Sequence, residues 1–336
     1  MQSTNPSSLL REMKRNITAG YPTMVWGSPG IGKSDIPRQL AQEMEIGILD
    51  FRANLFDPVD VRGIPYLCQR ENQTRYTSWA VPDVFPIVER DGNRGILFID
   101  EFPTAPPATQ NAFLQLLLDK QIGNYELPPG WAIVAAGNRL TDSAAVYQMP
   151  APVKNRFAHY ELEPSLEDWK VWAIQNGINE NVIAFVSYRP NLLSSFDADS
   201  YAFPTPRAWA MVSRMLSTQP RKEDLFGAVA SLVGEGAAGE FVAFHEIRAD
   251  LPDLDNLIAN PGSYKRDNNP ALLYALATGL AVRATDATLN GIMQVTNQIV
   301  KEYQVVVMKG IYAKDTNFRQ HPDVRDWVVK NKDKVL

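Results

Sequence analysis

The sequence predicts an α/β fold built on a mainly parallel sheet and followed by an all-helical region. Short apolar runs that end at turn residues recur through the first half of the chain, and helical patterns lie between several of them. After about residue 163 only helical patterns remain. Short continuous apolar runs suit strands that are buried on both faces. Their alternation with helices is typical of a parallel sheet covered on both sides.

The individual elements follow from these patterns in chain order. The start, MQSTNPSSLLREMKRN, is interpreted as a loop followed by a helix. Apolar runs predict strands at 23–26, 46–51, 95–99, 131–136 and 158–162. Helical periodicity predicts helices at 35–44 and 108–118 between them. The segment 64–81, with apolar residues around a polar tip at 69–74, is interpreted as a protruding hairpin.

The second half is expected to be helical throughout. Helices are predicted at 165–175, 182–188, 206–216, 222–233, 271–283 and 290–303. A turn is expected near residues 260–262, where the sequence reads Asn-Pro-Gly. We therefore expect three domains: an α/β domain at 1–162, a helical lid at 163–235 and a helical C-terminal extension at 236–336.

Composition narrows the class of protein. A formal charge of −5 over 336 residues argues weakly against a dedicated nucleic-acid binder, although a local basic patch is not excluded. With the single cysteine Cys68, no intramolecular disulfide can form. No apolar run approaches the roughly 20 residues that span a bilayer. We expect a cytoplasmic protein without a membrane partner.

A glycine-rich loop follows the first predicted strand and precedes a predicted helix. It reads GSPGIGKS and fits the phosphate-binding pattern G-x-x-x-x-G-K-[ST]. Glycines let the backbone approach phosphate oxygens, and the next helix points its N-terminus at the anion. Lys33 would neutralise the outer phosphates of ATP, and the Ser34 hydroxyl would ligate Mg²⁺. The predicted ATP-binding loop is Gly27, Ser28, Pro29, Gly30, Ile31, Gly32, Lys33 and Ser34.

Two carboxylates end the third predicted strand. The run ILFI leads directly into Asp100 and Glu101. Uncompensated buried charge is costly, and a magnesium ion would compensate it. Asp100 is therefore a candidate metal ligand, and Glu101 a candidate for activating the attacking water. The alternative is that both carboxylates mark a solvated strand end.

Asn138 follows the fourth predicted strand. Carboxyl ends of parallel strands face the ligand crevice, so Asn138 is expected to lie near the terminal phosphate and position the water. A turn asparagine is the alternative, because asparagine is common after glycine.

Two arginines complete the candidate set. Arg156, in PVKNRF, would stabilise transition-state charge on a neighbouring subunit, with Arg139 and Lys154 as competitors and a surface salt bridge as the alternative. Arg207 sits in the first turn of a predicted helix capped by Thr205, where a cation opposes the helix dipole. A nucleotide phosphate or a nearby carboxylate would compensate that placement.

The set as a whole resembles the AAA+ ATPases. GSPGIGKS, ILFIDE, AAGN, NRF and TPR are similar in order and spacing to Walker A, Walker B, first sensor, arginine finger and second sensor, over about residues 20 to 215. DPVDVRGIP and PAPVKNRF resemble the MoxR-type branch, although DEFPTAPP replaces the D-E-I-N-R common there, and Arg139 stands where proline often follows the sensor. The resemblance implies a P-loop domain, a helical lid, a ring of six subunits and chaperone-like remodelling of a protein client. Such proteins often work with a von Willebrand factor A domain partner.

We therefore expect ATP hydrolysis within a homo-oligomeric ring, with work done on a protein partner. The hairpin at 64–81 and the segment 121–129 are candidates for contact with a pore or client, and surface decoration is the alternative for the hairpin. Two rival functions stay open: a DNA-directed motor or loader of the same fold, and a nucleotide-gated scaffold with little turnover.

Overall fold

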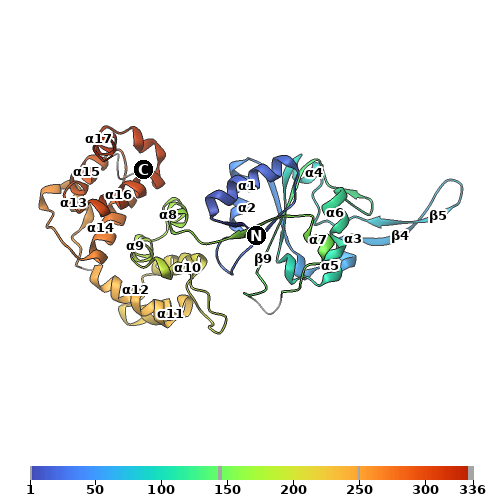
Figure 1. Ribbon diagram of the computed structural model, residues 1–336, viewed down its shortest axis with the longest axis horizontal. Coiled ribbons are helices and arrows are strands. Elements are labelled where there is room, and N and C mark those ends of the chain that lie inside the picture. The colour runs from blue at the N-terminus through green and yellow to red at the C-terminus, as the bar shows by residue number, and fades with distance from the viewer. Residues whose placement is uncertain (1, 143–145, 249, 332–336) are drawn as a thin grey trace. The chain divides into compact units, whose positions relative to one another are not determined.

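The computed structural model describes residues 2–142, 146–248 and 250–331 (Figure 1). By its internal contacts the chain divides into two compact units, Met1–Glu163 and Pro164–Leu336. The predicted domain boundaries at 162 and 235 stay predictions, and the second of them coincides with the first residue of helix α12 (Glu235–Arg248).

The first unit is organised around a six-stranded sheet within its described residues. The strands lie in the order β1-β10-β2-β9-β6-β3, and every pairing between them is parallel. Together with the helices of the second unit, this confirms the predicted fold class. The strands are β1 (Gln2–Thr4), β2 (Thr23–Trp26), β3 (Gly47–Arg52), β6 (Arg94–Asp100), β9 (Gly130–Gly137) and β10 (Ala158–Leu162).

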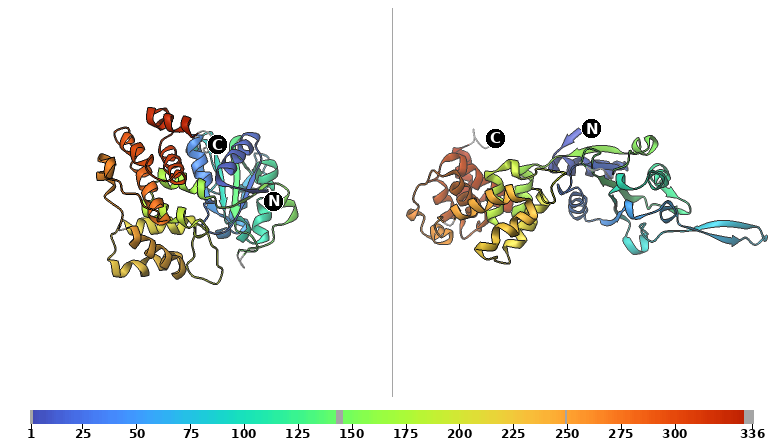
Figure 2. Two further views of the ribbon diagram at one scale, coloured as in Figure 1. Left: turned by 60° about the vertical axis from the view of Figure 1, so that its left-hand side comes forward. Right: turned by 90° about the horizontal axis from the view of Figure 1, so that it is seen from below.

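Helices cover both faces of this sheet (Figures 1 and 2). Alternate residues of each strand enter two separate cores: Leu97 and Ile99 of β6 face one core, whereas Ile96 and Phe98 face the other. This explains why the strands read as continuous apolar runs. The helices are α1 (Pro6–Ala19) and α2 (Asp35–Glu43) on one core, and α3 (Pro58–Arg62), α5 (Pro107–Ala112), α6 (Leu114–Asp119) and α7 (Ala151–Lys154) on the other, with the short α4 (Val88–Asp91) before β6.

Two local expectations for the first unit were wrong. The first residues are not a loop, because β1 pairs with β10 in parallel. The helix predicted at 108–118 is broken at Phe113, which ends α5 with φ −76° and ψ −11° and precedes α6. The Phe113 ring is fully buried and packs against Phe51 and Phe102, at centroid distances of 5.8 Å in both cases.

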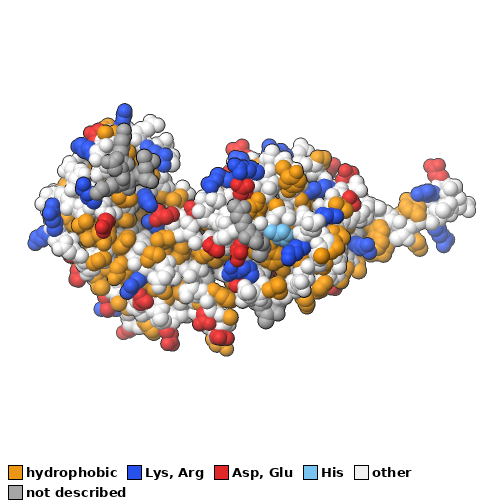
Figure 3. Space-filling model, in the orientation of Figure 1, with side chains coloured by type: hydrophobic (Ala, Val, Ile, Leu, Met, Phe, Trp, Pro, Cys, Tyr) orange, Lys and Arg blue, Asp and Glu red, His pale blue; other side chains and the backbone are white. Residues whose placement is uncertain are grey.

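The hairpin predicted at 64–81 is present as β4 (Ile64–Gln69) and β5 (Arg75–Ala80), paired antiparallel. It projects from the first unit, and hydrophobic side chains are visible along it (Figures 1 and 3). Leu67 is 74% exposed. A smaller hairpin, β7 (Gln121–Ile122) and β8 (Tyr125–Glu126), lies at its base, where the Asn124 side chain donates to the Trp79 carbonyl oxygen.

The second unit is helical in its described part. Its helices fill two apolar cores, one formed mainly by α8 to α12 and one mainly by α13 to α17, and α14 contributes to both. The helices are α8 (Leu166–Gln175), α9 (Glu180–Tyr188), α10 (Pro206–Leu216), α11 (Lys222–Val233), α12, α13 (Leu254–Ala259), α14 (Pro270–Val282), α15 (Leu289–Thr296), α16 (Lys301–Lys314) and α17 (Pro322–Lys330). None of the helices in the described ranges is long and apolar enough to cross a membrane.

One helix predicted in this unit was wrong in extent. The segment 290–303 is divided between α15 and α16. Ile299 between them is buried, and its carbonyl oxygen accepts a hydrogen bond from Gln304 Nε2 at 2.9 Å. Trp327 Nε1 in turn donates to Gln304 Oε1 at 2.9 Å. A side-chain network therefore replaces the helical backbone ladder at this point.

Candidate functional site

The phosphate-type loop lies between β2 and α2, at the carboxyl edge of the sheet. Gly30 and Gly32 have φ values of +75° and +100°, which residues with a side chain rarely adopt. At Gly27 a methyl group would approach Ile31 Cδ1 to 2.5 Å and the Leu162 carbonyl oxygen to 2.9 Å. The glycines of the motif are therefore required by the conformation of the loop itself.

The loop presents backbone donors at the start of α2. Among the described residues, the amides of Gly30, Ile31, Gly32 and Ser34 donate no hydrogen bond. Unpaired amides at the start of a helix favour an anion, because their partial positive charges add to the helix dipole. The loop thus has the donors that a phosphate group needs.

Lys33 is buried and points back across the mouth of the loop. The residue is only 8% exposed. Lys33 Nζ donates to the carbonyl oxygens of Gly27 and Ser28 and to Asn138 Oδ1, each at 2.8 Å. Asn138 follows the last residue of β9, so the structure brings the loop lysine and the predicted sensor asparagine into direct contact.

The acidic pair lies on the adjacent strand end. Ser34 Oγ donates to Asp100 Oδ2 at 2.8 Å, and the Glu101 backbone amide donates to Asp100 Oδ1 at 2.9 Å. Glu101 adopts a left-handed conformation, with φ 54° and ψ 30°. A non-glycine residue in this region costs of the order of 1 kcal/mol and marks a position that its surroundings hold in place. The fully buried ring of Phe102 directly follows Glu101.

Arg139 forms a clamp that the sequence did not predict. Its guanidinium binds Asp142 Oδ2 and Glu161 Oε1, both at 2.7 Å, and donates to Ser28 Oγ at 2.6 Å. The hydrogen bonds that its guanidinium donates to these two carboxylates raise the pKa of Arg139 further above its ordinary value. The clamp ties the loop, the segment after β9 and strand β10 together. Its signal in the sequence was an arginine directly after the sensor asparagine.

Arg156 and Lys154 lie at the α7–β10 connection of the same unit. Arg156 Nε is buried and has no hydrogen-bond partner among the described residues. Lys154 is exposed, and its carbonyl oxygen lies 2.7 Å from His159 Nε2. Trp26 Nε1, at the end of β2, donates to His159 Nδ1 at 2.9 Å. His159 therefore connects this segment to the strand that enters the phosphate-type loop.

Arg207 belongs to the second unit. It is exposed in the first turn of α10, where Thr205 Oγ1 accepts from the Ala208 amide at 3.0 Å, as the sequence predicted for a helix cap. Neither a hydrogen bond nor a salt bridge engages its guanidinium within the described ranges. The carboxylate partner considered as an alternative is therefore not found among these residues.

The donor set fits a nucleotide with its metal. Four free amides and a buried ammonium group match phosphate oxygens, and the Ser34 and Asp100 oxygens are the hard ligands that Mg²⁺ prefers. In the described chain no cluster of three or more histidine, cysteine or acidic side chains holds a metal unaided. Phosphate oxygens and water would complete a magnesium site of this kind.

Comparisons with known proteins give similarity at the level of structure only. No family model matches the chain, and no curated protein matches it in sequence. The RuvB Holliday junction branch migration motor of Thermotoga maritima is 16% identical, with a TM-score of 0.37 over 83% of this chain and 81% of that one. A putative ATPase from Cytophaga hutchinsonii is 13% identical, with a TM-score of 0.37 over 98% and 89%. NtrX from Brucella abortus is 14% identical, with a TM-score of 0.35 over 96% and 64%.

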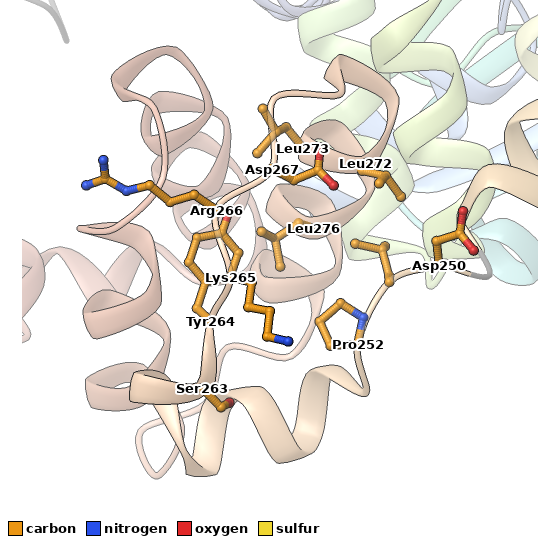
Figure 4. A pocket seen from close by; sticks show the side chains of 11 residues that line it. Asp250, Pro252, Ser263, Tyr264, Lys265, Arg266, Asp267, Leu272, Leu273 and Leu276 are labelled. Carbon is orange, nitrogen blue, oxygen red and sulfur yellow. The ribbon is translucent and has the colours of Figure 1, made fainter.

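A cavity of about 360 Å³ lies elsewhere, in the second unit. Its wall is formed by leucines of α14, among them Leu272 and Leu276, and Figure 4 shows Arg266 extending away from Leu276. The buried side chains in its lining are all leucines.

Proposed function

We propose that this chain is a P-loop ATPase of the AAA+ type, which binds ATP with Mg²⁺ and hydrolyses it. The observation that carries the proposal is the convergence of Lys33, Asn138, Ser34 and Asp100 at one edge of the sheet, through contacts of 2.8 Å. These residues come from three separate parts of the sequence. A structural ion pair or turn needs no such meeting of a glycine loop, an acidic strand end and an amide.

The contacts within the site indicate what each residue would do. Lys33 would exchange its bond to Asn138 for the outer phosphates, which releases the Asn138 carboxamide to orient water. Ser34 and Asp100, now joined directly, would hold the metal between them. Mg²⁺, when bound, supplies positive charge that neutralises the phosphate oxygens. Gly27, Ser28, Pro29, Gly30, Ile31 and Gly32 would enclose the phosphates with their backbone.

Glu101 would hold or deprotonate the attacking water. Its backbone amide donates to Asp100 Oδ1 at 2.9 Å, and its backbone is held in a left-handed conformation. Two adjacent carboxylates can then serve two roles, one for the metal and one for the water. The Arg139 clamp binds the Ser28 hydroxyl of the loop.

The test is the substitution Glu101→Gln. The carboxamide keeps the size and polarity of the side chain but cannot take a proton, so ATP affinity is retained and hydrolysis falls by about 10²-fold or more. Affinity is measured by calorimetry with MgATP, and turnover by phosphate release. Glu89→Gln, at an exposed position of α4, is the matched control and keeps normal turnover. Normal turnover of Glu101→Gln would remove the water-activating role, and no binding of MgATP by the unaltered protein would remove the proposal.

We further infer that the active form is a homo-oligomeric ring, by analogy six-membered, with Arg156 acting on a neighbour's nucleotide. Arg139 is engaged by Asp142 and Glu161 of its own chain, which leaves it poorly placed to reach another subunit. Arg156 has an unpartnered Nε among the described residues, and Lys154 is the remaining competitor.

Mixing two inactive variants tests this assignment. Arg156→Ala and Lys33→Ala each lack ATPase activity, because one removes the trans-acting charge and the other the phosphate ligand. A mixed ring contains some sites with an intact Lys33 and an intact neighbouring Arg156, so part of the activity returns. If no ATPase activity returns at any mixing ratio, Arg156 has no trans-acting role. If activity returns instead when Lys154→Ala is mixed with Lys33→Ala, the trans-acting residue is Lys154.

The proposed work of this ATPase is MoxR-like remodelling of a protein client. The proposed partner is a von Willebrand factor A domain protein. The projecting β4–β5 hairpin, with Leu67 and Ile64 exposed, supports a client-contacting role. We propose residues 163–235 as the lid, with the unpartnered Arg207 as its phosphate ligand, and 236–336 as a helical extension. The Glu101→Gln variant should capture a protein in the presence of MgATP, and adding Leu67→Ser should abolish the capture if the hairpin contacts the client. Salt-sensitive stimulation of turnover by DNA would contradict the remodelling role.

A further inference from the structure

The His159 side chain connects two parts of the first unit. It lies on β10, and Trp26 Nε1, at the end of β2, donates to its Nδ1 atom at 2.9 Å. Its Nε2 atom lies 2.7 Å from the carbonyl oxygen of Lys154, the last residue of α7. We call this arrangement of the Trp26 indole, the imidazole and the Lys154 carbonyl the His159 bridge. It joins the strand that enters the phosphate-type loop to the segment that carries Arg156.

The two partners of His159 determine the form of its ring. An indole N–H can only donate, and a backbone carbonyl oxygen can only accept. Nδ1 must therefore be the nitrogen without a proton, and Nε2 must carry the proton and donate it to the Lys154 carbonyl oxygen. An imidazolium ring would turn a second N–H toward the indole N–H and lose that bond. Only the neutral ring with its proton on Nε2 makes both bonds.

Trp26 is the fixed side of the bridge. The residue is 8% exposed, and its strand is paired with β10 on one side and with β9 on the other. Its side chain belongs to the apolar core that also contains Phe102 and Phe157. The His159 ring stacks beside the indole, with centroids 6.0 Å apart and an interplanar angle of 22°. The sheet and its core thus hold the donor in place.

The end of α7 depends more on the bridge. This helix has only four residues, so it forms few hydrogen bonds of its own. The Phe157 amide reaches the Lys154 carbonyl oxygen at 3.4 Å, whereas His159 Nε2 lies 2.7 Å from the same atom. The side-chain contact is the closer of the two. Its loss would leave the carbonyl oxygen with the long backbone contact.

Arg156 takes its position from this stretch of backbone. Its Nε atom has no hydrogen-bond partner, and no salt bridge engages its guanidinium, within the part of the chain that the structure describes. The main chain between Lys154 and His159 therefore sets where the guanidinium begins. A displacement of about 1 Å at a group that acts on the transition state lowers turnover by up to about 10²-fold.

We propose that His159 is a positioning residue of the ATPase: anchored on Trp26, it holds the Lys154 carbonyl and so sets the reach of Arg156 toward a neighbouring subunit's nucleotide. The inference rests on the proposed function. It adds to that function a residue outside the phosphate-type loop and the acidic pair. Because Arg156 acts across a subunit boundary, loss of the His159 bridge lowers turnover at the neighbour's site and leaves MgATP affinity unchanged.

Two substitutions remove the bridge from its two sides. His159→Leu removes both bonds, and Trp26→Phe removes the indole donor but keeps an aromatic ring. Each should lower kcat by about tenfold, which corresponds to the loss of one hydrogen bond, while KM for ATP stays unchanged. Since both act on one bridge, the double variant should lose no more than His159→Leu alone. Unchanged kcat, or effects that multiply in the double variant, would overturn the proposal.

Trp131→Phe is the matched control for lost packing. Trp131 lies at the start of β9, at the opposite edge of the sheet from the phosphate-type loop, and belongs to the same apolar core as Trp26. It is 4% exposed, and its Nε1 donates to the Gly92 carbonyl oxygen at 2.9 Å. Trp131→Phe should lower the midpoint of urea unfolding as Trp26→Phe does, but keep its kcat. An equal loss of kcat in both variants would show that damage to the core alone explains the effect.

Mixed rings show in which subunit the defect lies. Subunits with His159→Leu keep Lys33, and subunits with Lys33→Ala keep His159 and Arg156. Where the two are neighbours, a site with an intact Lys33 faces an intact bridge. Turnover per His159→Leu subunit should therefore rise when the Lys33→Ala protein is added, although that protein is itself inactive. No rise would place the defect in the subunit's own site and overturn the proposal.

The bridge is also visible without nucleotide. The chain has three histidines, so full-length protein with ¹⁵N-labelled histidine gives few ring signals, and His159→Leu assigns the one from His159. We expect the proton on Nε2 and a shift of the Nδ1 signal in Trp26→Phe; a proton on Nδ1, or no shift, would overturn the bridge. If these signals are as expected but the unaltered protein binds no MgATP, the proposed function fails, and the positioning role fails with it. Normal turnover of the variants in an active enzyme removes the positioning role alone.

Discussion

The end of strand β9 is packed so closely that a single methyl group should disturb the proposed site. A Cβ atom at Gly137 would lie 2.1 Å from Pro103 Cδ and 2.5 Å from Pro103 Cγ. Gly137 directly precedes Asn138, and Pro103 lies two residues after Glu101. The substitution Gly137→Ala therefore acts between the two residues proposed to position and activate the water, and it leaves both of their side chains unaltered.

The size of the effect follows from these distances. Ordinary contact begins at 3.4 Å, so Pro103 or the end of β9 must retreat by about 1.3 Å. The rigid, buried proline ring cannot rotate away, so the displacement passes to the backbone. Overpacking of this kind destabilises folding by about 1–3 kcal/mol. A misplacement of about 1 Å near the reacting atoms lowers turnover by about 10²-fold.

The assay compares unfolding in urea, MgATP affinity and phosphate release. Gly137→Ala should lose stability and turnover, and MgATP affinity should fall less than turnover, because the residues that enclose the phosphates lie between β2 and α2. Gly227→Ala is the control, since no heavy atom lies within 4 Å of its Cβ position and its helix gains about 0.5–1 kcal/mol. If Gly137→Ala unfolds and turns over like the unaltered protein, the reasoning about this contact is refuted.

Two further predictions concern the second unit. Because the pKa of His245 is lowered in the folded protein, the unfolded chain binds a proton at this residue more readily than the folded one. The free energy of unfolding should therefore fall as the pH drops below about 6.5. His245→Gln should remove that part of the pH dependence of urea unfolding. Glu180 binds both Arg248 and Arg283 in a partly buried cluster. Glu180→Gln leaves these two cations without their shared carboxylate, so it should destabilise the second unit by about 2 kcal/mol. An unchanged urea midpoint for Glu180→Gln would contradict the second prediction.

Much of the sheet could be predicted, because buried parallel strands leave a direct mark in the sequence. The strands at 23–26 and 158–162 end where the apolar runs predicted. β1 could not be predicted in this way: it has three residues, and its strand conformation depends on a partner about 158 positions away. The break at Phe113 was also hidden, since periodicity reports a continuous apolar face and not the rings of Phe51 and Phe102 that enclose that side chain.

The candidate site was likewise predictable from the sequence only in part. The meeting of Lys33 with Asn138, and of Ser34 with Asp100, follows from the rule that parallel strands present their carboxyl ends on one side. The Arg139 clamp does not follow from it. Its partner Glu161 lies on β10, and the sequence alone gave no reason to place β10 directly beside β2.

The close approach of Gly27 to the Leu162 carbonyl oxygen has a mechanical consequence. Leu162 is the last residue of β10, and Glu163, where the first unit ends, donates its amide to Thr4 of β1 at 2.9 Å. With no room for even a methyl group between them, Gly27 and Leu162 act as two rigid surfaces in contact. A displacement of the Leu162 backbone toward Gly27 would therefore have to move the residue that opens the glycine loop.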